Sequence, residues 1–285
     1  MKYKIILSIL VILLSAGFAN AATLNVGQGQ TYTTIQSAVN AAKTDDVISV
    51  SEGTYSENIV VKMNGISIIG QDKGKTIIDG KKTGSVIRIE ANNVTVSGFT
   101  IQNSGGSGQY DAGITLYGSN NNEIANLIIV NNIVGISIYQ GSNNNVVSGN
   151  DIRQNSKYGV YVFASNDNKI YNNNIQDNGI GFYGDTARTN QIYSNNFIDN
   201  TNQAYDNSGM NAWDGNYWSK YIILGGANAK DNHPLPNPVT IEEEAITTPA
   251  AQNTGAATGT GKSAPGFAGI MVMASLIAVW ILRKR

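Results

Sequence analysis

The chain of 285 residues carries little charge: 14% of its residues are charged, and its formal net charge at pH 7 is -1. Such a chain has no basic field for phosphate backbones, which argues against nucleic acid as a partner. It contains no cysteine, which excludes disulfides, thiolate metal sites and cysteine nucleophiles. Asparagine is in excess, with 37 residues, of which 28 lie between Asn92 and Asn216.

The N-terminal segment, residues 1–21, has the pattern of a cleaved secretory signal peptide. Lys2 and Lys4 precede an apolar run from Ile5 to Leu14, and Ala19-Asn20-Ala21 has the small-x-small form that signal peptidase accepts. We expect the mature chain to begin at Ala22. An uncleaved signal anchor is the alternative, but the apolar run is short for a membrane span of about 20 residues.

Residues 22–91 are predicted to form an N-terminal cap and the first coils of an all-β body. A single apolar face indicates one short helix, with Thr33 or Thr34 as its N-cap. That face consists of Ile35, Ala38, Val39 and Ala42. The helix is expected to cover the open end of the apolar core. The first strands are predicted at Val47–Val50, Ile59–Val61, Ile66–Ile69 and Thr76–Ile78.

Residues 92–209 repeat with a period of 22 or 23 residues. Each repeat is marked by an asparagine two positions before an Ile or Val: Asn122, Asn145, Asn168 and Asn190. A period of this length, with short apolar pairs separated by Asn or Gly, is typical of a β-solenoid. A leucine-rich repeat has a similar period but needs a lattice of leucines, and leucine is scarce in this region.

The asparagines of the repeat are predicted to stack as hydrogen-bonded ladders. Asn tolerates the left-handed backbone conformation at corners, and its side-chain amide both donates and accepts. The expected columns are Asn132/Asn155/Asn178/Asn200 and Asn150/Asn173/Asn195. A calcium site made of Asn and Asp oxygens is the alternative, but the glycine-rich nonapeptide pattern that binds calcium is absent. We therefore predict no metal site and no cofactor.

Each regular coil is predicted to end in an alternating strand: Gly113–Tyr117, Gly135–Tyr139 and Gly159–Phe163. Alternation places aliphatic side chains on one face and hydroxyl and aromatic side chains on the other. Because stacked strands lie about 4.8 Å apart, the outward rings form an amphipathic platform. We hypothesise that it binds a glycan through Tyr110, Tyr117, Tyr139, Tyr161, Phe163 and Tyr183, Tyr110 coming from a glycine-rich loop. The alternative is that the rings only stiffen the sheet.

Three carboxylates are weak catalytic candidates: Asp111, Asp177 and Asp199. A glycoside hydrolase needs two carboxylates as acid and base, and Asp177 and Asp199 share one column of the repeat. Polar corners of a solenoid explain the same pattern, and that interpretation is favoured. If the protein is an enzyme, we expect a polysaccharide lyase, epimerase or glycoside hydrolase, and the balance leans away from catalysis.

The C-terminal part is divided into three segments. Residues 210–236 contain Trp213 and Trp218, which are expected to close the last coil as an apolar lid. Residues 237–264 are rich in Thr, Ala, Gly and Pro and are predicted to be a disordered linker. Residues 265–285 hold one apolar helix followed by a basic end, which is just long enough to span a membrane.

The chain resembles pectin-lyase-like proteins and, more closely, the NosD-like family of exported proteins. The resemblance lies in the repeats, in the N-terminal cap from Thr31 to Glu57 and in the segment from Asn211 to Ser219. The resemblance covers Leu24 to Pro236 and implies a right-handed parallel β-helix. The family is associated with copper delivery to a metalloenzyme, which makes an accessory role in metalloenzyme maturation a further alternative. Copper prefers imidazole, thiolate or thioether ligands, and the mature body offers only His233, Met63 and Met210. The copper function is therefore not carried over.

The extreme C-terminus resembles the PGF-type sorting signal of archaeal surface proteins, with Pro265-Gly266-Phe267, an apolar span and Arg283-Lys284-Arg285 in order. The resemblance implies that signal peptidase and an archaeosortase process the chain and that a lipid replaces the span. An ordinary membrane anchor is the alternative. Either way we expect a protein on the outer face of the cell membrane, acting as a structural or carbohydrate-binding module of an archaeal envelope whose partner is a surface glycan.

Overall fold

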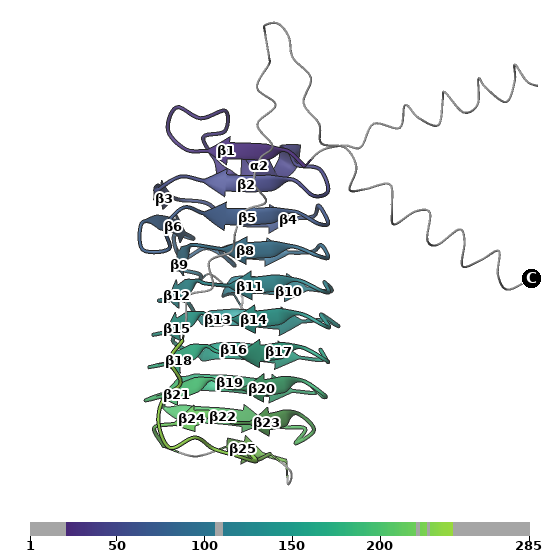
Figure 1. Cartoon of the computed structure of the whole chain (residues 1–285), viewed down its shortest axis with the longest axis vertical. Helices are drawn as coiled ribbons and strands as arrows, with labels where there is room; N and C mark the ends of the chain where they lie inside the picture. Colours follow the sequence, from purple (N-terminus) through teal and green to yellow (C-terminus); the bar gives the residue numbers. More distant parts are fainter. Residues whose placement is uncertain (1–20, 106–110, 221–222, 227–228, 242–285) are drawn as a thin grey trace, which may run out of the picture. The chain divides into compact units, whose positions relative to one another are not determined.

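The computed structural model describes residues 21–105, 111–220, 223–226 and 229–241. These residues form three sheets, called A, B and C, whose strands are all parallel and whose chain path visits A, B and C in turn. Each circuit is one coil, and the coils stack in sequence order (Figure 1). The predicted parallel β-helix is confirmed. Residues 1–20 of the predicted signal peptide (1–21), Tyr110 and the whole of 242–285, with Pro265, Gly266 and Phe267, lie outside the described residues.

Sheet A contains nine strands: β1 (Thr23–Val26), β2 (Val47–Val50), β5 (Ser67–Gly70), β8 (Thr95–Ser97), β11 (Glu123–Ala125), β14 (Val146–Ser148), β17 (Lys169–Tyr171), β20 (Gln191–Tyr193) and β23 (Ala212–Asp214). Sheet B contains eight: β3 (Gly53–Tyr55), β6 (Thr76–Asp79), β9 (Thr100–Gln102), β12 (Ile128–Val130), β15 (Asp151–Arg153), β18 (Asn174–Gln176), β21 (Asn196–Ile198) and β24 (Tyr217–Trp218). Sheet C also contains eight: β4 (Ile59–Val61), β7 (Ile87–Ile89), β10 (Ala112–Tyr117), β13 (Val134–Tyr139), β16 (Tyr158–Phe163), β19 (Ile180–Asp185), β22 (Asn202–Asp206) and β25 (Ile223–Gly225).

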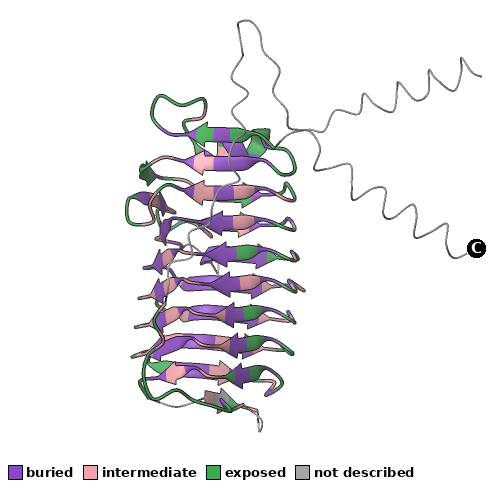
Figure 2. Cartoon of the chain, in the orientation of Figure 1, coloured by how far each residue is buried: buried purple, intermediate pink, exposed green. Residues whose placement is uncertain are grey.

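Buried residues recur in coil after coil (Figure 2), and the core that they form consists mainly of aliphatic side chains. In sheet C, Ile114 pairs in register with Ile136 and Ile136 with Val160, and all three side chains are fully buried. Each such side chain contributes about 1.5–3 kcal/mol by leaving water. The residues that the alternation predicted to face the core in these strands are therefore confirmed as buried.

The strands of sheet C bend at a column of glycines: Gly113, Gly135, Gly159 and Gly181. A Cβ added at Gly135 would lie 2.5 Å from the carbonyl oxygen of Gly159 and 2.8 Å from Cγ2 of Ile152, so this position faces the core. The next residue, Ile136, is also buried in the core. Two consecutive positions, the glycine and the residue after it, therefore face the core, and the alternation of inward and outward side chains begins only after the glycine. A side chain at the glycine position would collide with the neighbouring coil.

Three asparagine ladders run along the coils. In each ladder the side-chain Nδ2 donates to Oδ1 of the asparagine in the next coil, at 2.8 to 3.2 Å. The ladders are Asn132/155/178/200, Asn150/173/195/216 and Asn145/168/190/211. The two predicted columns are confirmed, and their side-chain amides are satisfied away from water.

The left-handed corner positions are different residues from the ladder asparagines. Asn131, which directly precedes Asn132, has φ 59°, and Asp177, which precedes Asn178, has φ 54°. The sequence prediction gave both tasks to the same asparagine, and that part is wrong. The structure divides them between neighbours: an exposed corner residue adopts positive φ, and the buried residue after it carries the ladder.

The N-terminal end is closed by the short helix α2 (Ile35–Ala41), whose N-cap is Thr34, as predicted. The Glu57 carboxylate accepts the backbone N–H groups of Ile35 and Gln36, each at 2.9 Å. Gln36 then uses its own side-chain amide on the outer edge of β4: Oε1 accepts the Val60 N–H at 2.7 Å and Nε2 donates to the Val60 carbonyl at 3.2 Å. The Gln36 side chain thus satisfies the backbone N–H and carbonyl of Val60, which would otherwise be unpaired at the edge of the sheet.

The C-terminal end is closed by Trp213 and Trp218, both buried, with the Trp218 ring stacked 4.4 Å from that of Phe197. The predicted aromatic lid is confirmed. Beyond it, residues 229–241 form a segment that we call the strap. It bridges to β23 at Asp231 and to β24 at Leu235, and it reaches β21 through Val239 (Figure 1). The predicted linker, which was expected to begin at residue 237, thus still contacts the body at Val239.

Candidate functional site

The outer face of sheet C carries a dense group of aromatic rings, which we call the aromatic face. Tyr117, Tyr139 and Phe163 form one column, with ring centroids 5.7 and 5.3 Å apart. Tyr161, Tyr183 and Tyr205 form the adjacent column, at 5.8 and 5.0 Å. Tyr158 joins them, with its ring 5.2 Å from that of Tyr161 and 5.0 Å from that of Tyr183.

The rings differ in how much of them a ligand could touch. Tyr117 is 37% exposed, whereas Tyr161 is only 3% exposed, within a small cluster that includes Ala112 and Val134. The other rings of the face are partly buried. Five of the six residues predicted for glycan binding therefore lie together on one surface, with Tyr161 as its buried centre, and the sixth, Tyr110, lies outside the described residues.

Charged groups flank the rings at both ends of the columns. The Arg88 guanidinium lies 4.0 Å from the centre of the Tyr117 ring, and its Nε is 2.6 Å from Oε1 of Glu90. The hydrogen bond from Arg88 holds the pKa of Glu90 below its usual range. At the other end, Asp185 follows Phe163 in the column and accepts the Asn207 amide at 3.1 Å. The surface is thus apolar in its middle and hydrogen-bonding at its rim.

Two residues of the aromatic face, Tyr158 and Tyr205, were not predicted. Tyr205 continues the column of Tyr161 and Tyr183 at the same spacing of 22 residues, so the repeat contained the signal for it. Tyr158 has the sequence parity of the inward residue Val160. It reaches the outer face because alternation is interrupted at Gly159, and a simple period of two does not predict that interruption.

Two of the three catalytic candidates lie at exposed corners of the coils. Asp177 and Asp199 occupy neighbouring left-handed corners, with φ 54° and 50°, and both are exposed. One strand spacing of about 4.8 Å is near the carboxyl separation in retaining glycosidases. The Asp199 carboxylate, however, accepts a hydrogen bond from the Ser219 hydroxyl at 3.2 Å. Within the described part of the chain, neither carboxylate forms an ion pair. Asp111 precedes β10, where its carbonyl accepts the Ser104 hydroxyl at 3.2 Å.

The possible copper ligands do not make a metal site either. Nδ1 of His233 lies 2.6 Å from Oδ1 of Asp214 on an exposed surface, and Met63 and Met210 are also exposed. Within the ranges that the structure describes, no three His, Cys, Asp or Glu side chains are grouped to hold a metal ion. Because copper takes imidazole or soft sulfur ligands in combination, these residues do not fit it.

Fold and surface together define the class: a parallel β-helix that presents stacked aromatic rings on one sheet. The family model described as "Periplasmic copper-binding protein (NosD)" matches residues 19–223, and the chain belongs to this family. The copper in the family's description finds no corresponding donor set in the described residues of this member.

Two curated proteins are similar to parts of the chain. A cell surface glycoprotein of Methanothermus fervidus is 34% identical over 132 residues, which is 45% of this chain and 22% of that protein. Pectinesterase 2 of Citrus sinensis is 34% identical over 107 residues, which is 33% of this chain and 21% of that protein. The chain thus matches only about a fifth of the length of each relative.

Among solved structures, the alginate lyase from Paenibacillus sp. str. FPU-7 superposes with a TM-score of 0.50 at 15% identity, covering 76% of this chain and 96% of that one. Likeness at this identity shows the shared fold. Among the described residues, no helix has the length and apolar character that crossing a membrane requires.

Proposed function

We propose that the protein is a carbohydrate-binding module of the cell envelope that holds a polysaccharide on the aromatic face of sheet C. The observation that carries this proposal is the pair of adjacent ring columns on an otherwise polar solenoid. Flat rings offer apolar area to the C–H faces of a pyranose, and phenol hydroxyls supply hydrogen bonds beside it. The Arg88–Glu90 pair and Asp185 supply further donors and acceptors for sugar hydroxyls at the two ends.

The proposed location is extracellular. It is supported by the signal-peptide pattern of residues 1–21, by the family's periplasmic description and by the cell surface glycoprotein among the relatives. We extend the proposal to anchoring through the C-terminus, with the PGF-type segment cleaved by an archaeosortase and replaced by lipid. Mass spectrometry of the mature protein tests this step: a C-terminus that still includes Phe267 and the apolar span contradicts it.

A polysaccharide-active enzyme is the second candidate. It is supported by the pectinesterase relative and by the adjacent carboxylates of Asp177 and Asp199. The weakness of this candidate is that both side chains are exposed at corners of the coils. Release of reducing ends or unsaturated uronates from envelope polysaccharide, abolished by Asp177→Asn with Asp199→Asn, would replace the binding proposal with this one.

The binding proposal is tested with the mature protein, a glycan array and isothermal titration calorimetry with the oligosaccharides that bind. The double variant Tyr117→Ala with Tyr139→Ala removes two accessible rings and leaves the buried Tyr161 in place. We expect its affinity to fall about tenfold or more. Met63→Ala, an exposed side chain outside the aromatic face, is the control and should bind as the parent does. Equal binding by parent and double variant would exclude the aromatic face.

A further inference from the structure

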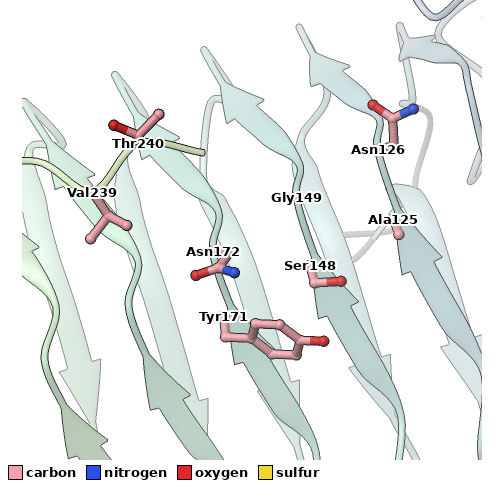
Figure 3. A pocket seen from close by; sticks show the side chains of 8 residues that line it. All are labelled: Ala125, Asn126, Ser148, Gly149, Tyr171, Asn172, Val239 and Thr240. Atoms are coloured by element: carbon pink, nitrogen blue, oxygen red, sulfur yellow. The ribbon is translucent and has the colours of Figure 1, made fainter. Parts of the chain in front are cut away.

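A hollow lies on sheet A, on a different surface from the aromatic face. It has a volume of about 220 Å³. Its lining comes from β11, β14, β17, their following corners and the strap: Ala125, Asn126, Ser148, Gly149, Tyr171, Asn172, Val239 and Thr240 (Figure 3). This volume is below the roughly 300–1,000 Å³ of pockets that hold drug-sized ligands. It suits one small ring.

One side of the hollow is aromatic. The rings of Tyr171 and Tyr193 are nearly parallel, at 6°, with centroids 5.0 Å apart. In the same column the next two positions are Ser148 and Ala125, which are small. The stack therefore stops at Tyr171, whose ring points toward the strand of Ser148 in Figure 3. A recess remains where further rings would continue the column.

The residues that line the rim are polar and uncharged, and one ammonium, that of Lys73, lies beside them. Asn126 and Asn172 occupy left-handed corners, with φ 52° and 51°, so their amides project outward and take no part in the ladders. Oδ1 of Asn126 accepts from the Lys73 ammonium at 3.0 Å, which fixes the orientation of that amide. The Ser148 and Thr240 hydroxyls complete the rim. No carboxylate lines the hollow, so the ammonium of an aromatic amino acid finds no ion-pair partner there.

The remaining wall belongs to the strap. Asn196 holds Val239 by two hydrogen bonds: its Oδ1 accepts the Val239 N–H at 2.7 Å, and its Nδ2 donates to the Val239 carbonyl at 2.8 Å. The hollow is therefore complete only when the strap is docked. A ligand that touches both walls binds the docked form more tightly, so by linkage it stabilises docking.

We propose that this hollow binds a single hexopyranose unit, stacked against Tyr171 and hydrogen-bonded by Asn126, Asn172 and Thr240, and that the bound sugar holds the strap to the solenoid. The site is separate from the aromatic face, and the two proposals stand or fall independently. Its occupant is one sugar unit, whereas the columns of sheet C suit an extended polysaccharide.

The first experiment titrates the mature protein with a panel of neutral monosaccharides and their N-acetyl derivatives, followed by NMR. We expect the best of them to lose about tenfold in affinity in Tyr171→Ala. Ser148→Tyr extends the ring column into the recess and should abolish binding while thermal unfolding stays at or above the parent's temperature. The control is Met63→Ala, an exposed side chain outside both surfaces, which should leave monosaccharide binding unchanged.

The second experiment measures hydrogen exchange at the Val239 amide. We expect the bound sugar to slow exchange there, and we expect Asn196→Ala to speed exchange and to weaken sugar binding together. The proposal is overturned if no sugar of the panel binds, or if binding survives both Tyr171→Ala and Ser148→Tyr. Sugar binding that leaves Val239 exchange unchanged would remove the role of the strap.

Discussion

Asn216 and Asp231 are joined through one carboxylate oxygen: Oδ2 of Asp231 accepts the backbone N–H of Asn216 at 2.9 Å and its side-chain amide at 3.0 Å. Asn195 makes the same two contacts with Oδ1 of Asn216, at 3.0 Å each. Asp231 therefore stands where the next asparagine of the ladder would be. The ladder of Asn211 ends in the same way on Asp206, at 2.9 Å, and that of Asn200 ends on Gln203, at 2.8 Å.

Asp231→Ala is expected to lower the free energy of unfolding by about 3 kcal/mol, because it leaves buried donors of Asn216 and Trp218 without an acceptor. Asp231→Asn keeps one acceptor oxygen in place and should lose clearly less. Urea unfolding followed by tryptophan fluorescence measures both, since Trp218 lies at the site. Equal losses in the two variants would show that the acceptor is not what matters.

Asn131 and Asn132 are adjacent, but the same substitution should have little effect at Asn131 and a large destabilising effect at Asn132. Asn131→Asp places a carboxylate at an exposed left-handed corner, where Asp177 and Asp199 already occur, so the change should stay within about 0.5 kcal/mol. Asn132→Asp places it in the ladder, facing Oδ1 of Asn155 and the carbonyls of Ile101 and Val130. We expect a loss of about 3 kcal/mol or more at neutral pH.

Burial raises the pKa of a carboxyl introduced at position 132, so its destabilising charge is lost by protonation as the pH falls. Thermal unfolding at neutral and at acid pH should therefore show the Asn132→Asp deficit shrinking in acid. A deficit that is the same at both pH values would contradict this explanation.

Gly135→Ala is expected to destabilise the body by about 2–3 kcal/mol, because its Cβ would lie 2.5 Å from the carbonyl oxygen of Gly159 in the next coil. Gly141→Asn is the control: nothing lies within 4 Å of a Cβ there, and Asn tolerates the local φ of 75°. Differential scanning calorimetry of both variants checks the contrast. A Gly135→Ala protein as stable as the parent would mean that the coils separate without cost.

Gln36→Ala should expose the edge of β4, because the backbone N–H and carbonyl of Val60 both lose their side-chain partner. Open parallel edges pair with other chains, so we expect concentration-dependent self-association, measured by light scattering. Asn40→Ala, which removes only a contact to the same glutamine, is the control. A Gln36→Ala protein that stays monomeric at high concentration would contradict the edge-blocking role.

Asp79 is expected to make the free energy of unfolding depend on pH in the acid range. Burial alone raises the pKa of Asp79, but hydrogen bonds from the Lys81 N–H and from the amides of Gln102 and Asn103 outweigh it and hold the pKa below its ordinary value. A depressed folded-state pKa stabilises the protein above the unfolded value of about 3.9, and this stability is lost as the pH falls below it. Urea midpoints between about pH 5 and pH 3 should drop less in Asp79→Ala than in the parent.

The repeat predicted the fold and most of the candidate site because inward and outward residues recur at fixed spacing. Ile136, Asn155 and Tyr183 could each be placed from their equivalents in neighbouring coils. The ladder ends could not, because Asp206 and Asp231 are identified only once it is known which coil is last. Nor could the contact of Val239 with Asn196, which joins residues 43 apart across the outside of the coils and follows no period.

The side-chain amides of the three buried ladders point one way, with donors facing the C-terminal end of the chain. A coil duplicated between Asn155 and Asn178 would find an acceptor ahead and a donor behind, whereas a coil added after Asp231 would meet a carboxylate that has nothing to donate. A whole coil can therefore be inserted or removed inside the ladders, in steps of about 4.8 Å, without a change to either end. The same duplications would lengthen the aromatic columns on sheet C.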